Sequence, residues 1–157
     1  VFCPEGTDEH DYGILETYKK ELWQRLAPKG IIVSMEAYIQ GTKKDIIDKF
    51  AQGSIDMLFA KQRLNEGIDI PSTKRAIFIA SSTSEREFIQ RRGRVLRKSP
   101  GKDIAEIYDF IVIPPKSGDY EAKYTKLIVD TEMKRAMEFA LSAENYKDVE
   151  SMLRDYI

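Results

Sequence analysis

The sequence lacks most of what secreted, membrane-spanning and metal-binding proteins depend on. Among its 157 residues there is one cysteine, Cys3, and one histidine, His10. A single cysteine excludes an internal disulfide, and an isolated histidine does not form a ligand cluster, so we expect no metal site. No apolar run approaches the roughly 20 residues that a membrane-spanning helix needs. Because no signal-like segment opens the sequence either, we expect a cytoplasmic protein without a membrane partner.

A phosphate-binding loop is missing as well. The sequence contains no G-x-x-x-x-G-K-[ST] stretch to hold the phosphates of a nucleotide, and no acidic pair on a strand to hold Mg²⁺. The chain also begins at Val1 without Met, which is typical of a domain cut from a longer polypeptide. A net charge of −1 is weak evidence on nucleic-acid binding, although residues 86–102 hold seven Lys or Arg against one acid.

What is present indicates one α/β domain. Hydrophobic residues make up 42% of the chain, enough for a buried core, and strand-like apolar runs alternate with helical patterns. We expect strands at 1–3, 30–35, 55–60, 74–80 and 104–113. The run at 30–35 is almost entirely apolar, as a strand buried on both faces of a parallel sheet would be. The sequence therefore predicts a mostly parallel sheet flanked by helices.

Residues 84–97 predict a helix with a row of donors on one face. Ser84 and Glu87 form an S-x-x-E capping box at its start. With Gln90 at zero, Arg94 falls at about 40° and Arg97 at about −20° around the helix. Long side chains ending in guanidinium groups are suited to multidentate contact with phosphate oxygens. By itself an Arg-rich run is more typical of a solvated basic helix.

A glycine turn precedes that helix by some twenty residues, in the stretch Asn65-Glu66-Gly67-Ile68-Asp69-Ile70-Pro71. Gly67 permits a strained backbone at the carboxyl end of a strand, where ligands bind in open α/β sheets. Asp69 is either a residue that caps the turn or a contact to a bound ligand, and the residues alone leave both open.

Together, Q-R-R-G-R-V-L-R at 90–97 and the N-E-G-I-D-I-P turn resemble motifs VI and V of superfamily 2 helicases, most closely the XPB-type DNA-repair and restriction-associated enzymes. The resemblance implies a RecA-like three-layer α/β/α sandwich, the second motor domain of a two-domain enzyme. It implies an ATP site shared with an N-terminal RecA-like domain of the same polypeptide, which would supply the Mg²⁺ ligands. It assigns ATP binding to Gly67, Asp69, Gln90, Arg94 and Arg97, with Arg94 and Arg97 as catalytic arginine fingers.

The resemblance also implies contacts to a nucleic-acid backbone, from Thr42, Lys43, Gln62 and Ser82. For Thr42 and Lys43 the ordinary interpretation is a capped surface helix, since Thr42 and Asp45 fit a capping box. For the hydroxyl residues around Ser82 it is a linking loop. DNA is the expected substrate, although Q-R-R-G-R-x-x-R also occurs in viral RNA helicases.

The C-terminal part changes in composition. We expect a motor domain at 1–115 and a short helical extension at 116–157. Two apolar stripes are predicted there, one made of Leu127, Ile128, Met133, Ala136, Met137, Ala140 and Leu141, and the other of Tyr146, Val149, Met152, Leu153 and Tyr156. A different hypothesis is a non-catalytic nucleic-acid-binding or assembly module that kept the fold. A self-contained nucleotide-binding enzyme would need the missing phosphate loop.

Overall fold

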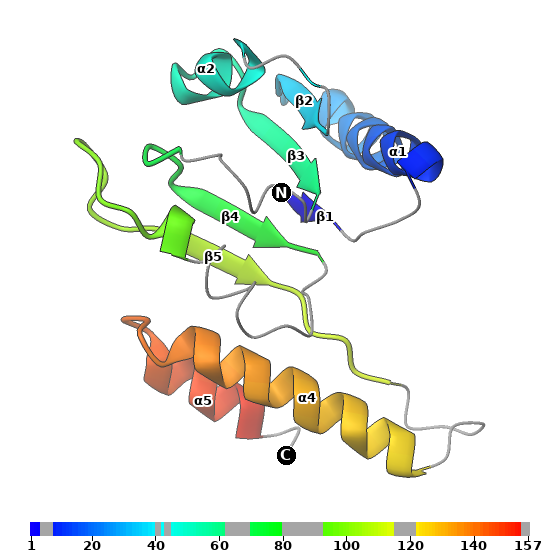
Figure 1. Ribbon diagram of the computed structural model, residues 1–157, viewed down its shortest axis with the longest axis vertical. Coiled ribbons are helices and arrows are strands. Elements are labelled where there is room, and N and C mark those ends of the chain that lie inside the picture. Colours follow the sequence, from blue (N-terminus) through cyan, green and yellow to red (C-terminus); the bar gives the residue numbers. More distant parts are fainter. Residues whose placement is uncertain are drawn as a thin grey trace. The chain divides into compact units, whose positions relative to one another are not determined.

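The computed structural model describes residues 1–3, 8–39, 42, 45–61, 70–79, 93–114 and 122–154. Five parallel strands form one sheet in the order β2-β3-β1-β4-β5 (Figure 1). The strands are β1 (Phe2–Cys3), β2 (Met35–Tyr38), β3 (Met57–Lys61), β4 (Arg75–Phe78) and β5 (Glu106–Asp109). The helices are α1 (Asp8–Leu26), the short 3-10 helix η1 (Ala27–Lys29), α2 (Asp45–Ala51), α4 (Ala122–Ala140) and α5 (Tyr146–Arg154). The predicted parallel α/β fold is confirmed.

The short strand β1 lies at the centre of the sheet, between β3 and β4. Phe2 is in register with Ala60 on one side and with Phe78 on the other. The Phe2 and Phe78 rings stack with centroids 4.6 Å apart and planes within 4°. Phe78 is fully buried, so this aromatic pair contributes both apolar area and a preferred ring geometry to the core.

Helix α1 covers the β1–β3 part of the sheet. Leu15 on this helix is fully buried and packs with Cys3, Ala37 and Phe59, with Tyr18 and Leu22 beside them. The helix ends through η1 at Gly30, whose φ of 72° is the left-handed conformation that glycine adopts without strain. The Pro28-Lys29-Gly30 stretch is a typical helix stop, and the structure agrees with that signal.

The prediction of a buried strand at 30–35 is wrong. Residues 31–34 have no regular structure, and Ile32 is 94% exposed. The strand begins at Met35, which is in register with Met57 of β3. Ser34 leads into this pairing, because its carbonyl accepts hydrogen bonds from the Asp56 and Met57 N–H groups and its own N–H donates to the Asp56 carboxylate. The position of β2 is therefore set by backbone pairing with β3, and not by the apolar run at 30–35.

The outer strand β5 carries a polar contact on its exposed face. Arg75 of β4 donates to both carboxylate oxygens of Glu106, at 2.7 and 3.3 Å, and the Tyr108 hydroxyl donates to the same carboxylate at 3.0 Å. These contacts lower the pKa of Glu106, chiefly through the Arg75 hydrogen bond. A charged outer strand is one way in which proteins discourage pairing with another chain.

The chain divides into two compact units, Val1–Tyr108 and Asp109–Ile157. The predicted functional boundary after residue 115 stays a prediction. In the second unit α4 packs against α5 around a small core of Met133, Ala136 and Leu153, with Ile111, Val129, Met137 and Val149 partly buried. Among the helices that the structure describes, none is long and apolar enough to cross a bilayer.

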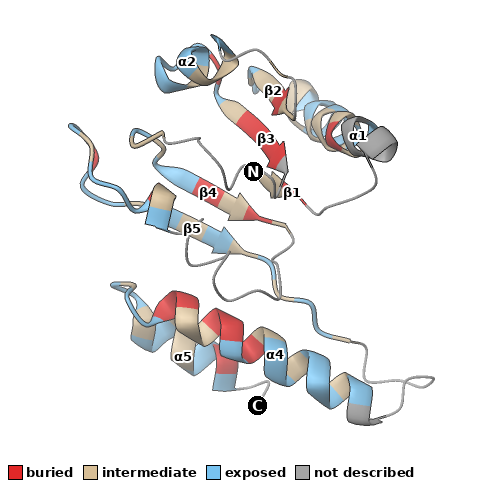
Figure 2. Ribbon diagram, viewed as in Figure 1, coloured by how far each residue is buried: buried red, intermediate tan, exposed pale blue. Residues whose placement is uncertain are grey.

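The predicted stripes are only partly correct. Figure 2 shows that burial on α4 is confined to its C-terminal half. Met133, Ala136, Ala140 and Leu153 are buried as expected, whereas Leu127, Leu141 and Met152 are each more than 60% exposed. Ile128 is 40% exposed. Helical periodicity identifies an apolar face, but α5 has only 9 residues and covers a correspondingly short part of it.

Candidate nucleotide and nucleic-acid site

The described part of the arginine-rich segment runs from Gly93 to Lys98. Residues 93–95 are helical, Leu96 is in a turn, and no helix continues through Arg97. Val95 is 4% exposed and anchors the segment in the core. Arg94 is partly buried and Arg97 is exposed. The expectation that both arginines project from one continuous helix is therefore wrong, because the helix ends between them.

A tight turn at Ser99–Lys102 follows this helix end. Pro100 occupies the second position, and Gly101 at the third has a φ of 72°, the arrangement of a type II turn. The Lys102 N–H donates to the Ser99 carbonyl at 3.1 Å. The sequence Ser-Pro-Gly-Lys predicts this turn correctly, and the chain reversal brings Lys102 back toward the helix end.

The Lys102 side chain is buried beneath the arginine segment. It is 8% exposed, and its ammonium Nζ donates to the Arg97 carbonyl at 3.0 Å, to the Pro71 carbonyl at 3.0 Å and to the Val95 carbonyl. Burial lowers the pKa of Lys102. The last carbonyls of a helix have no partner within it and carry partial negative charge, so an ammonium is a suitable cap.

This contact joins the two stretches that the sequence singles out. Pro71 is the last residue of the sequence motif at 65–71, and Val95 and Arg97 belong to the arginine segment. Sequence reasoning missed Lys102. Its contact with Pro71 joins residues 31 positions apart, and the hydrophobic pattern of the sequence does not indicate contacts at that separation. The turn at 99–102 is the one feature that points toward it, because it shows that the chain folds back.

Thr42 is the described member of the predicted nucleic-acid contacts. Its N–H donates to the Ile39 carbonyl at 3.0 Å, and its hydroxyl oxygen accepts the Ile39 N–H at 2.9 Å. These two hydrogen bonds hold the Thr42 hydroxyl next to Ile39, the residue after β2. The hydroxyl hydrogen can still donate to a phosphate oxygen.

The other predicted site residues lie outside the described residues. They are Gly67, Asp69 and Gln90 for ATP, and Lys43, Gln62 and Ser82 for nucleic acid. Of the assigned residues, the structure therefore places Thr42, Arg94 and Arg97.

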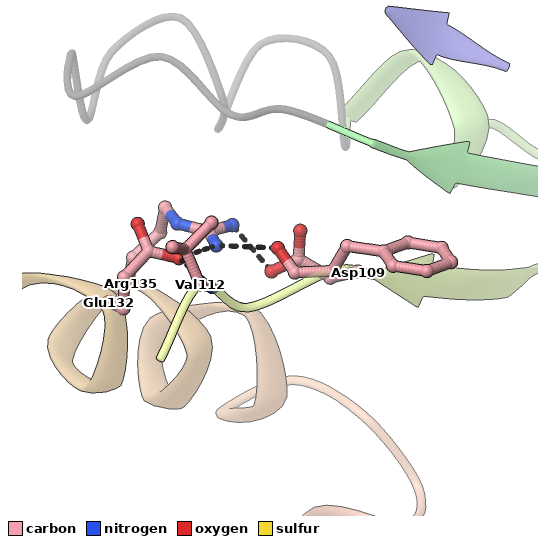
Figure 3. Close-up of polar contacts among 5 residues, drawn as sticks. Asp109, Val112, Glu132 and Arg135 are labelled. Atoms are coloured by element: carbon pink, nitrogen blue, oxygen red, sulfur yellow. Dashed lines mark hydrogen bonds and ion pairs between the residues drawn. The ribbon is translucent and has the colours of Figure 1, made fainter. Parts of the chain in front are cut away.

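The second unit holds a polar cluster that sequence reasoning also missed. Arg135 of α4 is 6% exposed and donates to the Asp109 carboxylate at 2.5 Å, the Glu132 carboxylate at 2.7 Å and the Phe110 carbonyl at 3.3 Å (Figure 3). Glu132 in turn accepts the Val112 N–H at 3.2 Å. Burial by itself would lower the pKa of Arg135, but the hydrogen bonds to the two carboxylates raise it. The cluster fastens residues 109–112 to α4.

Residues 15–99, just over half of the chain, match the family described as Helicase conserved C-terminal domain. The chain belongs to this family. The resemblance to superfamily 2 helicases through the two motifs is confirmed.

Several curated proteins are similar to this helicase C-terminal domain over part of its length. The DNA 3'-5' translocase XPB2 of Sulfurisphaera tokodaii is 36% identical over 56 residues, 36% of this chain and 13% of that protein. The putative ATP-dependent RNA helicase MJ1505 of Methanocaldococcus jannaschii is 35% identical over 94 residues, 59% of this chain and 11% of that protein. Dicer-like protein 2-2 of Aspergillus niger is 36% identical over 55 residues, 35% of this chain and 4% of that protein. The chain thus spans a small fraction of each relative.

Solved structures show the same fold at low sequence identity. The C-terminal part of the Fun30 ATPase domain superposes with a TM-score of 0.53 at 15% identity, covering 87% of this chain and 46% of that one. The yeast DEAD-box splicing factor Prp28 gives a TM-score of 0.51 at 12% identity, covering 99% of this chain and 36% of that one. The predicted RecA-like fold class is confirmed.

Proposed function

We propose that this domain is the second motor half of an ATP-dependent superfamily 2 helicase or translocase that acts on DNA. Its ATP site lies between this domain and an N-terminal RecA-like domain of the same polypeptide. Arg94 and Arg97 are the arginine fingers of that site, and Gly67, Asp69 and Gln90 complete this domain's side of it.

The observation that carries the proposal is that Arg94 and Arg97 lie on either side of a buried residue, Val95. Val95 is buried between them, and its carbonyl, like that of Arg97, accepts a hydrogen bond from Lys102. The backbone from which both guanidiniums extend is thereby anchored. An anchored pair of guanidiniums near a domain surface fits the triphosphate of a nucleotide in charge and in hydrogen-bonding geometry.

The chemistry required of these side chains is electrostatic. In phosphoryl transfer, negative charge spreads over the oxygens of the transferred group, and fixed donors stabilise it without moving at the moment of reaction. Mg²⁺, held by the other domain, supplies further charge neutralisation when bound. Each of the two arginines contributes five N–H donors from this domain to the phosphate oxygens.

DNA is proposed because a relative at 36% identity is named a DNA translocase. Thr42, Lys43, Gln62 and Ser82 are its proposed backbone contacts. RNA is the second candidate, because a relative 35% identical over 94 residues is named a putative RNA helicase. To separate the two, ATP turnover by the full-length protein is measured with DNA duplexes and with RNA duplexes of the same sequence. Stronger stimulation by DNA is expected. Stimulation by RNA alone would reverse the assignment.

Replacing the fingers tests the nucleotide site. In the full-length protein, Arg94→Ala and Arg97→Ala should each lower ATP turnover by roughly 10³-fold, as loss of an arginine finger does in related chemistry. Nucleic-acid affinity should change little, because these side chains face the nucleotide. Lys98→Ala, an exposed cation next to Arg97, is the matched control and should leave turnover unchanged.

Two results would contradict the proposal. If both arginine variants kept normal turnover but bound DNA weakly, the segment would be a nucleic-acid contact. If the full-length protein bound nucleic acid and never hydrolysed ATP, the domain would be a binding or assembly module that kept the fold.

A further inference from the structure

Lys102 donates to three backbone carbonyls in two separate segments. Two of them, Val95 and Arg97, bracket the end of the arginine helix, and the third belongs to Pro71 at the end of the glycine turn. An ammonium has three hydrogens, so these contacts use its full donor capacity. Within the described part of the chain Lys102 forms no ion pair, and its charge is balanced by carbonyl dipoles.

Burying this ammonium costs free energy, and substituting Lys102 would disturb the backbone around it. Burying an ammonium without a carboxylate removes its hydration, and only well-aligned acceptors offset that loss. Removing the ammonium would leave three carbonyls in a poorly hydrated place, so they would move apart or admit water. The backbone at risk is the one that carries Arg94 and Arg97.

We propose that Lys102 is a positioning residue of the nucleotide site, holding the backbone at Val95 and Arg97 against Pro71 so that the arginine fingers reach the nucleotide together. This inference rests on the proposed function. Lys102 acts through the backbone of other residues and does not itself touch ATP.

The geometry explains why a positioning residue is needed here. The helix ends at residues 95–96, so Arg97 lies beyond the last helical residue. Its carbonyl accepts a hydrogen bond from Lys102. Catalytic groups displaced by about 1 Å can lose about 10²-fold in rate, so a weakly held Arg97 would be a poor finger. The same ammonium at Pro71 links this position to the stretch in which Asp69 is the proposed nucleotide contact.

The test uses the full-length protein and separates kcat from KM. Lys102→Met keeps the length of the side chain and removes all three donors. We expect it to lower kcat for ATP between about 10-fold and about 10²-fold, with KM for ATP and nucleic-acid affinity changed less than about threefold. Lys98→Met removes an exposed cation four residues earlier and should leave kcat unchanged.

A variant that lacks both fingers distinguishes positioning from general stabilisation. If Lys102 acts through the fingers, then Arg94→Ala/Arg97→Ala/Lys102→Met should be no slower than Arg94→Ala/Arg97→Ala, because both positioned groups are already absent. Independent, multiplicative losses would overturn the proposal. Unchanged kcat in Lys102→Met, with Arg94→Ala and Arg97→Ala still inactive, would overturn it while leaving the proposed function intact. Normal turnover in both arginine variants would instead refute the proposed function.

Lys102→Arg covers the case in which Lys102→Met does not fold. It keeps the charge, but its planar fork cannot direct three donors to carbonyls arranged around a single nitrogen. We expect a folded protein, checked by circular dichroism, with kcat lowered at least fivefold. Wild-type kcat in this variant would show that charge alone suffices and that Lys102 has no positioning role.

Discussion

At Cys3, burial decides the chemistry of the only thiol in the chain. The residue is 1% exposed in the centre of the sheet, and burial raises its pKa from 9.0 to about 11. The folded state therefore keeps the proton over a range in which the unfolded state gives it up. Between about pH 9 and pH 11 the unfolded chain binds fewer protons, so stability falls as the pH rises.

A comparison with Cys3→Ala measures this effect. Urea denaturation at several pH values from 8 to about 11 should show that the free energy of unfolding of the wild type falls more steeply than that of the variant. Other groups that titrate in this range are common to both proteins and cancel in the difference. Equal slopes would show that the thiol ionises in the folded state as readily as in the unfolded one. In the folded wild type at neutral pH, thiol reagents should also react slowly.

At the scale of elements, a buried arginine holds the second unit together. Arg135→Ala would leave the Asp109 and Glu132 carboxylates, 12% and 20% exposed, without their guanidinium partner. Removing one partner of a buried ion pair typically costs about 3–5 kcal/mol. We expect a loss of that size for α4 and the residues 109–112 attached to it, measured by hydrogen exchange of the α4 amides.

Arg154→Ala is the matched control for this loss. Arg154 pairs with Glu150 one turn away on α5, but its side chain is 71% exposed. Exposed pairs of this kind contribute about 0.3–0.5 kcal/mol. Similar losses in the two variants would mean that the Arg135 cluster is no stronger than a surface pair.

At the scale of the whole molecule, the domain carries half of a proposed site. It has no phosphate-binding loop and no acidic pair for Mg²⁺, so the isolated 157-residue chain should release no phosphate from ATP above background, with or without DNA. The full-length protein in the same assay is the positive control. Turnover by the isolated domain would show that a complete site lies within these residues.

Local sequence determined the family, the parallel α/β class and the turn at 99–102. These features depend on residues only a few positions apart: the motif residues, the alternating apolar patterns and a Pro-Gly pair. Such short-range signals can be recognised from the sequence alone. It also located the end of α1 at Gly30, where the backbone requires a glycine.

Only the tertiary structure decided where β2 begins, where the arginine helix ends and which apolar residues are covered. Ile32 looks like a core residue and is exposed, because the neighbouring strand offers its backbone to Met35–Tyr38 instead. Lys102 and Arg135 look like solvated cations and are buried, because each also has an acceptor far away in the sequence, Pro71 at 31 positions and Asp109 at 26 positions. Periodicity describes one element at a time, whereas burial and hydrogen bonding depend on a second element that the first one does not specify.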